Sequence, residues 1–487
     1  MAVMKKFRWL VGCGLSLGVA LSPAQADTLR EAMVSAYQTN PTLSSARAGQ
    51  RAIDENVPIA RSNGLPSSGV QGSYSENFLK SANSFTSPDR QVTGGISLTV
   101  PIYSGGAVRN AIKAARIRVD AGQADLRATE ASLFSNVVAA YMDVIRDEAI
   151  VSLNRTNVQV LDVNLQATSD RYEIGDLTRT DVAQSEARLS IARSDLQTAE
   201  ANLIRSREIY IQLVGHPPGE LEPPPPLPNL PDSPDAAVDV ALAANPDLIA
   251  QTERRDAADV DVDAARAGHM PQVELFSEGA YANYLGTLGS DTVSGVFVQE
   301  QSTAAAGVRV TIPVYQGGRV AAQVRQAQAR SSQAMEDRVA VERNVIAQTR
   351  AAYSSWRASQ QVIESSKRAV DANQLALEGV RAENSVGNRT ILDILDAERE
   401  LLNSQVQLVT ARRNAYVAGF SLLAAMGRAE ARDLGLDGGV LYDPQVNYER
   451  VGDKIFDWDS DPDPEVQATR TVDSPAQDAT IAGPVDY

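Results

Sequence analysis

Cysteine and histidine are almost absent from this sequence of 487 residues, which contains one cysteine and two histidines. The single cysteine, Cys13, has no partner for a disulfide within the chain. His216 and His269 have no second histidine or cysteine at the spacing of a metal site or a catalytic pair, and there is no phosphate-binding glycine loop. These absences argue against an enzyme, and we expect neither a cofactor nor a metal.

Aromatic side chains and positive charge are also scarce. Aromatic residues make up 5% of the chain against a hydrophobic content of 43%, which predicts packing by small side chains instead of thick globular cores. The formal net charge is −16. Because the phosphate backbone of nucleic acids is itself negative, this charge argues against nucleic-acid binding.

Long apolar runs are missing everywhere except at the N-terminus, so no later segment offers the roughly 20 apolar residues that a membrane-spanning helix needs. The run "WLVGCGLSLGVAL" follows a basic start and reaches "AQA" just before Asp27, which predicts a cleaved signal peptide over residues 1–26. A lipoprotein box, "LVGC" ending at Cys13, is the alternative, but its apolar stretch is too short for a signal. An exported chain of this kind can span a membrane only with strands.

A duplicated phrase divides the chain. "PIYSGG" occupies positions 101–106 and "PVYQGG" occupies 313–318, and a shift of 212 positions aligns the two copies without a gap as far as Gly215 and Gly427. Upstream, "NPTL" matches "NPDL" with a shift of 205. A proline-rich segment joins the copies, and an acidic tail that we expect to be largely disordered follows them. The predicted segments are repeat 1 over 27–216, the linker over 217–234, repeat 2 over 235–428 and the tail over 429–487.

Each repeat contains two long stretches without proline and rich in helix-forming residues. The longer stretch would reach about 100 Å as a helix, which is more than the width of an ordinary domain. The shorter stretch follows a glycine, Gly175 or Gly387, where we expect the chain to turn back. The predicted long helices cover 107–174 and 319–386, and the predicted return helices cover 176–214 and 388–426.

Before each duplicated phrase the apolar pattern changes to a period of two, as in the alternation of Val92, Ile96 and Val100 with polar or small residues. The length matches a tilted membrane strand, and strand pairs are predicted at about 69–103 and 272–315. Two hairpins packed on soluble protein are the alternative. Four strands cannot close a barrel, and lipid does not tolerate open edges. Two chains would give eight strands and three would give twelve, and the strand count leaves both open.

The sequence resembles the TolC-type outer-membrane channel family over about residues 28–427. The resemblance rests on the duplicated "P-x-Y-x-G-G" phrase, the "NP" pairs, and the motifs "RYEIGDLTRTDV" and "SVGNRTILDILDAE". It implies a mixed α and β fold: a homotrimer in which one twelve-stranded barrel in the outer-membrane lipid of a Gram-negative bacterium continues into a helical barrel in the periplasm.

The resemblance also implies a function, that of an exit duct for protein secretion (type I) or small-molecule efflux. A periplasmic adaptor would connect the duct to an inner-membrane ABC exporter or proton-driven pump. The alternative functions are a periplasmic coiled-coil adaptor and a trimeric surface stalk. Paired strands in both repeats argue against these two alternatives.

By the same resemblance, Asp393 and Asp396 match an acidic ring at the periplasmic mouth. Arg389 matches an arginine that holds this tip closed through contacts with Thr180 and Asp181 of the neighbouring repeat. The chain departs from the pattern at position 384, where asparagine replaces the tyrosine of the best-known member, which puts a full closing network in doubt. Helix capping is the alternative role of Asp181 and Asp393, because each follows a threonine by three positions.

The duplicated phrase itself is predicted to mark the junction between strand and helix. A proline would end the strand, a tyrosine would lie at the lipid boundary, and two glycines would let the backbone turn. The residues concerned are Pro101, Tyr103, Gly105, Gly106, Pro313, Tyr315, Gly317 and Gly318.

Overall fold

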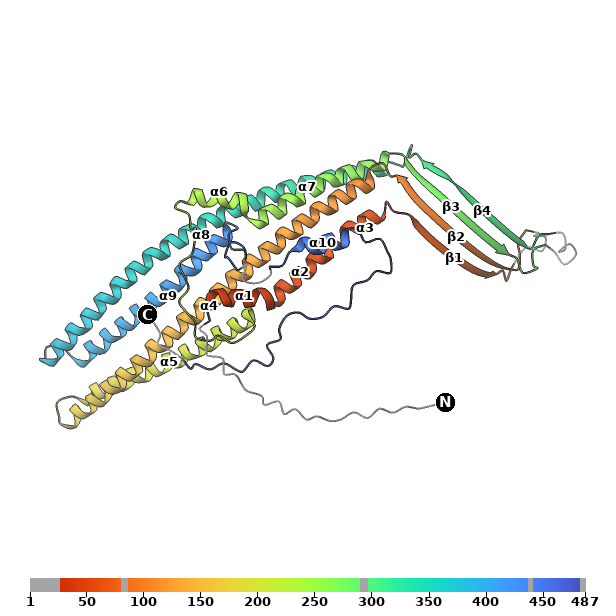
Figure 1. The fold of residues 1–487 in the computed structure, drawn as a ribbon. Helices are drawn as coiled ribbons and strands as arrows, with labels where there is room; N and C mark the ends of the chain where they lie inside the picture. Colours follow the sequence, from red (N-terminus) through yellow and green to blue (C-terminus); the bar gives the residue numbers. More distant parts are fainter. Residues whose placement is uncertain (1–26, 80–85, 290–296, 437–440, 482–487) are drawn as a thin grey trace, which may run out of the picture.

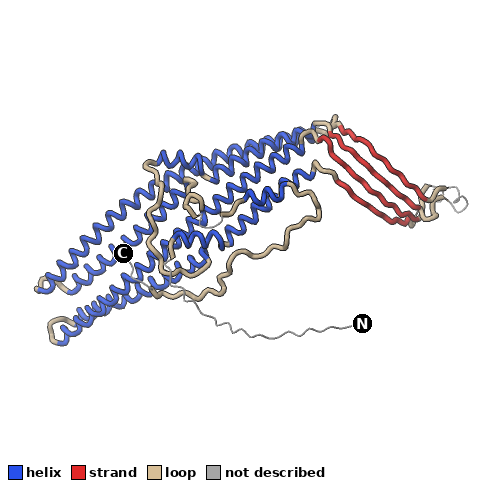
Figure 2. Tube along the Cα trace, in the orientation of Figure 1, coloured by secondary structure: helices blue, strands red, loops and turns tan. Residues whose placement is uncertain are grey.

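The computed structural model describes residues 27–79, 86–289, 297–436 and 441–481. The signal peptide predicted over residues 1–26 lies outside the described residues. Figure 1 shows an elongated molecule with a four-stranded sheet at one end and the bends of two long helical hairpins at the other. Helices fill most of the length between these ends in Figure 2. The mixed α and β fold expected from the sequence is confirmed.

The sheet has one apolar and one polar face, because residues along each strand alternate between its two sides. Val70 on one strand pairs with Ile96 on the next, and both side chains are largely exposed in the single chain. On the other face, Arg309 forms an ion pair with Glu274 at 2.6 Å. The strands pair antiparallel in the order β1 (Ser67–Glu76), β2 (Arg90–Tyr103), β3 (Gln272–Asn283) and β4 (Glu300–Thr311).

The pairing of the strands repeats along with the sequence. Ser67 pairs with Thr99 in the first hairpin, and Gln272 pairs with Thr311 in the second. Gln272 lies 205 positions after Ser67, and Thr311 lies 212 positions after Thr99. These are the two shifts that align the sequence copies. The two hairpins therefore have the same register, and β2 pairs with β3 to join the repeats.

Pro101 does not end its strand, contrary to the sequence-based expectation. It lies within β2, where it pairs with Glu274, and the register shifts between Pro101 and Tyr103. Pairing between β1 and β2 has already stopped at Thr99, so β2 has a neighbour on one side only at this point. A proline, which lacks a backbone N–H, is tolerated there. The glycines that follow have positive φ angles, +66° at Gly105 and +92° at Gly106, and turn the chain into the next helix.

Two long helices and two return helices build the hairpins. The long helices are α4 (Ala107–Glu173) and α8 (Arg319–Ser385), and the return helices are α5 (Arg179–Val214) and α9 (Ile391–Ala425). The return helices begin three residues later than predicted, because threonines at positions 178 and 390 cap them. None of the described helices is both long enough and apolar enough to cross a bilayer. The shorter helices are α1 (Leu29–Thr39), α2 (Pro41–Asp54), α3 (Asn56–Ser62), α6 (Pro234–Ala244), α7 (Pro246–Arg266) and η1 (Ala267–His269).

A tyrosine in each repeat fastens the proline-rich linker to the helices. The hydroxyl of Tyr141 on α4 donates to the carbonyl oxygen of Glu222 at 2.6 Å. Its repeat partner, Tyr353 on α8, donates to the carbonyl oxygen of Asp232 at 2.8 Å. Tyr141 is fully buried in a cluster with Phe134 and other apolar side chains. The linker therefore crosses the helices at the level of the main apolar core.

The acidic tail differs from the expectation of disorder over its described part. It contains α10 (Pro444–Gly452), whose Asn447 donates to the buried carboxylate of Asp54 at 2.6 Å. Farther on, Arg207 of α5 donates to the carbonyl oxygens of Asp478 and Thr480. Composition suggested disorder because the tail has few apolar residues of its own. Partners on distant helices supply the missing contacts.

Candidate functional site

The two hairpin bends lie at the end opposite the sheet (Figure 1). Gly175 and Gly387 have φ angles of +84° and +83°, which side chains with a Cβ rarely adopt. Thr178 and Asp181 form a complete capping box after the first bend, and the pair at 390 and 393 does so after the second. Hydrogen bonds from the capping threonines lower the pKa of Asp181 and of Asp393. The capping role is therefore confirmed for both aspartates, and both carboxylates are charged at neutral pH.

Arg389 makes its contacts within its own hairpin. Its Nε donates to Glu383 at 2.7 Å, and its Nη1 lies 3.8 Å from a carboxylate oxygen of Asp393. The hydrogen bond and charge of Glu383 raise the pKa of Arg389. Asn384 donates from its side chain to the carbonyl oxygen of Arg389 at 2.7 Å. Among the described residues of one chain, Arg389 forms no hydrogen bond with Thr180 and no ion pair with Asp181.

Asp396 is paired with a residue that sequence reasoning missed. Arg188 on α5 donates to Asp396 on α9 at 2.6 Å, which ties the two hairpins together. The guanidinium neutralises one of the two carboxylates that were expected to form the acidic ring. The duplication gave no signal for this pair, because the shift of 212 aligns Arg188 with Glu400 and Gln184 with Asp396.

Glu398 forms a second contact between the hairpins that the sequence did not reveal. Its side chain is 5% exposed and accepts hydrogen bonds from Asn164 on α4 at 3.0 and 3.1 Å. Arg381 on α8 donates to the same carboxylate at 2.9 Å. One turn away, Leu395 is buried against Leu161 and other residues of the first hairpin. Together with Asp396, Leu395 and Glu398 form what we call the α9 clip.

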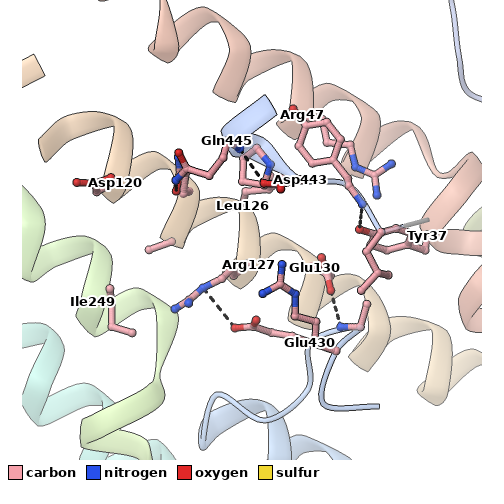
Figure 3. A pocket seen from close by; sticks show the side chains of 17 residues that line it. Tyr37, Arg47, Asp120, Leu126, Arg127, Glu130, Ile249, Glu430, Asp443 and Gln445 are labelled. Carbon is pink, nitrogen blue, oxygen red and sulfur yellow. Dashed lines mark hydrogen bonds and ion pairs between the residues drawn. The ribbon is translucent and has the colours of Figure 1, made fainter. Parts of the chain in front are cut away.

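A cavity of about 330 Å³ lies elsewhere, between α2, α4 and the segment that follows α9 (Figure 3). The Arg47 guanidinium lies 4.3 Å from the centre of the Tyr37 ring, and Glu130 accepts a hydrogen bond from the backbone of Ala431. Burial raises the pKa of Glu130. Arginines and carboxylates line this cavity together, so its charge selects neither anions nor cations. The hairpin ends are therefore the better candidate site.

Comparison with known sequences gives consistent matches over most of the chain. The sequence profile of the family described as "Outer membrane efflux protein" matches residues 32–216 and 237–428. The outer membrane efflux protein BepC of Brucella suis is 35% identical, over 93% of this chain and 97% of its own. The outer membrane protein TolC of Escherichia coli is 28% identical over 86% of both chains. The alkaline protease secretion protein AprF of Pseudomonas aeruginosa is 26% identical over 64% of both.

Among solved structures, the outer membrane protein VceC of Vibrio cholerae matches with a TM-score of 0.69 at 22% identity. The match covers 82% of this chain and 96% of that one. At this identity the likeness establishes the fold alone.

Proposed function

The chain belongs to the outer membrane efflux protein family, and we propose that three copies form one continuous duct with a closable periplasmic end. Its role is that of an exit duct in the outer membrane, serving efflux or secretion, as the resemblance to TolC-type channels implied. The two alternative functions, a periplasmic adaptor and a surface stalk, are wrong. The barrel would lie in the membrane and the helices would extend into the periplasm.

The unpaired edges of the sheet support the trimer. β1 and β4 each have a neighbour on one side only, and an open edge is not tolerated in lipid. Three copies of the four strands close a twelve-stranded barrel with a lumen. The apolar face, with side chains such as Ile96 and Val308 exposed, would then contact the lipid.

For the cargo and partners, we propose small-molecule efflux through a periplasmic adaptor and an inner-membrane proton-driven pump. The support is the 35% identity to a protein named for efflux. Protein secretion with an ABC exporter is the second candidate, supported by the similarity to AprF. The duct itself would have no enzymatic activity.

Deletion of the chain distinguishes these cargo classes. We expect a deletion strain to become more susceptible to dyes, detergents and antibiotics while its secreted proteins are unchanged. Restoration of growth by the plasmid-borne chain is the control. Loss of a secreted protein with unaltered susceptibility would instead favour the second candidate.

The closable end rests on one observation: α9 presents three consecutive contacts to the first hairpin of the same chain, through the clip residues. We propose that these contacts hold the two hairpins together when the duct is closed. Arg389 would contact Thr180 and Asp181 of the next chain, since within its own chain it is paired with Glu383 and Asp393 instead. The carboxylates of Asp393 and Asp396 would line the mouth, and the mouth would favour cations although Arg188 offsets the charge of Asp396.

The ion pair between Arg188 and Asp396 gives a test of that charge. Arg188→Gln and Asp396→Asn both break the pair, but the first leaves a free carboxylate and the second leaves a free guanidinium. We expect the cation-to-anion permeability ratio to rise about two- to threefold in Arg188→Gln and to fall in Asp396→Asn, the effect being limited by salt screening over about 8–10 Å. Reversal potentials in planar bilayers under a KCl gradient measure the ratio. Shifts in the same direction would rule out a charge effect at the mouth.

A further inference from the structure

The turn after α10 displays large apolar side chains to solvent. Trp458 is 97% exposed, the highest value among the large apolar side chains of the described residues, and Phe456 is 78% and Ile455 58% exposed. We call residues 455–459 the aromatic turn. The main apolar core of the protein lies elsewhere and leaves these side chains uncovered.

Ion pairs and a backbone hydrogen bond hold the aromatic turn in place. The backbone N–H of Asp459 donates to the carbonyl oxygen of Phe456 at 3.1 Å. Lys454 forms ion pairs with Asp459 at 3.3 Å and with Asp461 at 3.4 Å. Arg450 of α10 binds both carboxylate oxygens of Asp461 at 2.6 and 2.7 Å. The apolar side chains are therefore presented from a folded loop fastened to a helix.

The anchor of α10 places this turn near the start of the sheet. Arg61 of α3 donates to the carbonyl oxygen of Gly452 at 2.9 Å and to Asp453 at 2.7 Å. The end of α3 packs beside the first turn of α4, where a Cβ at Gly64 would lie 2.9 Å from the Val108 side chain. β1 begins at Ser67. In Figure 1 the chain leaves α10 beside α3 on the side toward the sheet.

We propose that the aromatic turn docks into the periplasmic surface of the outer membrane and contacts its phospholipids. The inference rests on the proposed function, because the sheet must lie in that membrane. Tryptophan prefers the interface between lipid tails and water. The base of the sheet also exposes apolar side chains, including Ile102 and Tyr103 on β2. The carboxylates of Asp457 and Asp459 flank the aromatic rings, so the turn suits a zwitterionic surface better than an anionic one.

Fluorescence quenching in reconstituted protein tests the contact. The full chain is placed in phosphatidylcholine nanodiscs with plain or brominated acyl chains, and the signal of Trp458 is the difference between the wild type and Trp458→Phe. We expect brominated lipid to reduce this component about twofold or more, since interfacial aromatic rings lie within reach of the acyl chains. The matched control is Trp356, which packs against Tyr353 in the helical part and whose component, obtained from Trp356→Phe, should not change.

Two outcomes would overturn the proposal. One is a Trp458 component that brominated lipid leaves unchanged and that aqueous iodide quenches. The other is a Trp458 component that responds only when a purified periplasmic adaptor is added, which would assign the turn to a protein partner. Because insertion of the barrel is checked separately by bilayer conductance, failure of the docking is distinguishable from failure of the proposed duct.

Discussion

Oxidation of a double variant, Tyr74→Cys with Val308→Cys, is expected to convert the protein into a covalent trimer. Within one chain, Ile96 of β2 pairs with Gly279 of β3. The repeat partner of Ile96, at a shift of 212, is Val308 of β4. The repeat partner of Gly279, at a shift of 205, is Tyr74 of β1. These two strands are the free edges of the sheet, so the pair forms between neighbouring chains. Residues directly opposite in antiparallel strands have Cα atoms about 4.5–5.5 Å apart, which suits a disulfide.

The measurement is the mass on a denaturing gel without reductant, where the oxidised variant should run at about three times the monomer mass because each chain is linked to two neighbours. The wild type offers a clean background, because its only cysteine is at position 13. Ile96→Cys with Gly279→Cys should link within the chain and remain a monomer. Ser73→Cys with Val308→Cys is the register control, because a slip of one residue moves a side chain to the other face. Equal linking of the register control would contradict the proposed closure.

Glu398→Ala is expected to open the periplasmic end. The substitution removes the carboxylate shared by Asn164 and Arg381, so Asn164 loses its partner on the other hairpin and Arg381 loses its partner within its own hairpin. Losing a buried, charged acceptor costs about 1–3 kcal/mol. If the contact exists only in the closed state, the open-to-closed ratio rises by about 5- to 150-fold. Single-channel conductance measures the open fraction directly.

The matched control for this variant is Glu186→Ala. Glu186 is the repeat partner of Glu398, but it is exposed and bonds to no other residue of the described chain. Its removal should leave conductance unchanged, and thermal unfolding of both variants checks that the fold is retained. Equal conductance of Glu398→Ala and the wild type, in a folded protein, would refute the gating role of the α9 clip.

The sequence predicted the helices and strands well where they depend on interactions between residues close together in the chain. The absence of proline, the period-two alternation and the glycines at 175 and 387 each act over a few neighbouring residues. The duplication then related elements far apart. Local rules also identified the capping threonines, although the starts of the return helices differed by three residues.

Contacts between distant segments were the part that sequence reasoning missed. Arg188 and Asp396 are 208 positions apart, and Asn164 and Glu398 are 234 apart. Helical periodicity shows which side of a helix is apolar, but it does not show which charged residue of another helix faces it. The contacts of the tail were missed for the same reason, because the partner of its backbone carbonyl groups is Arg207 on the distant helix α5. Pro101 was wrongly expected to end its strand. It is tolerated within β2 because the pairing of β1 with β2 ends at Thr99, and this register could not be read from the sequence.

The α9 clip has a consequence for the symmetry of the assembled duct. Six hairpins would surround the channel, and they would meet along two kinds of seam. The seam within a chain holds Glu398 against Asn164, whereas the repeat relation places Glu186 opposite Ala376 at the seam between chains. Alanine offers no hydrogen bond there. The backbone would thus be nearly sixfold, but the contacts that hold the hairpins together would be only threefold. Full opening would require the clip within each chain to break.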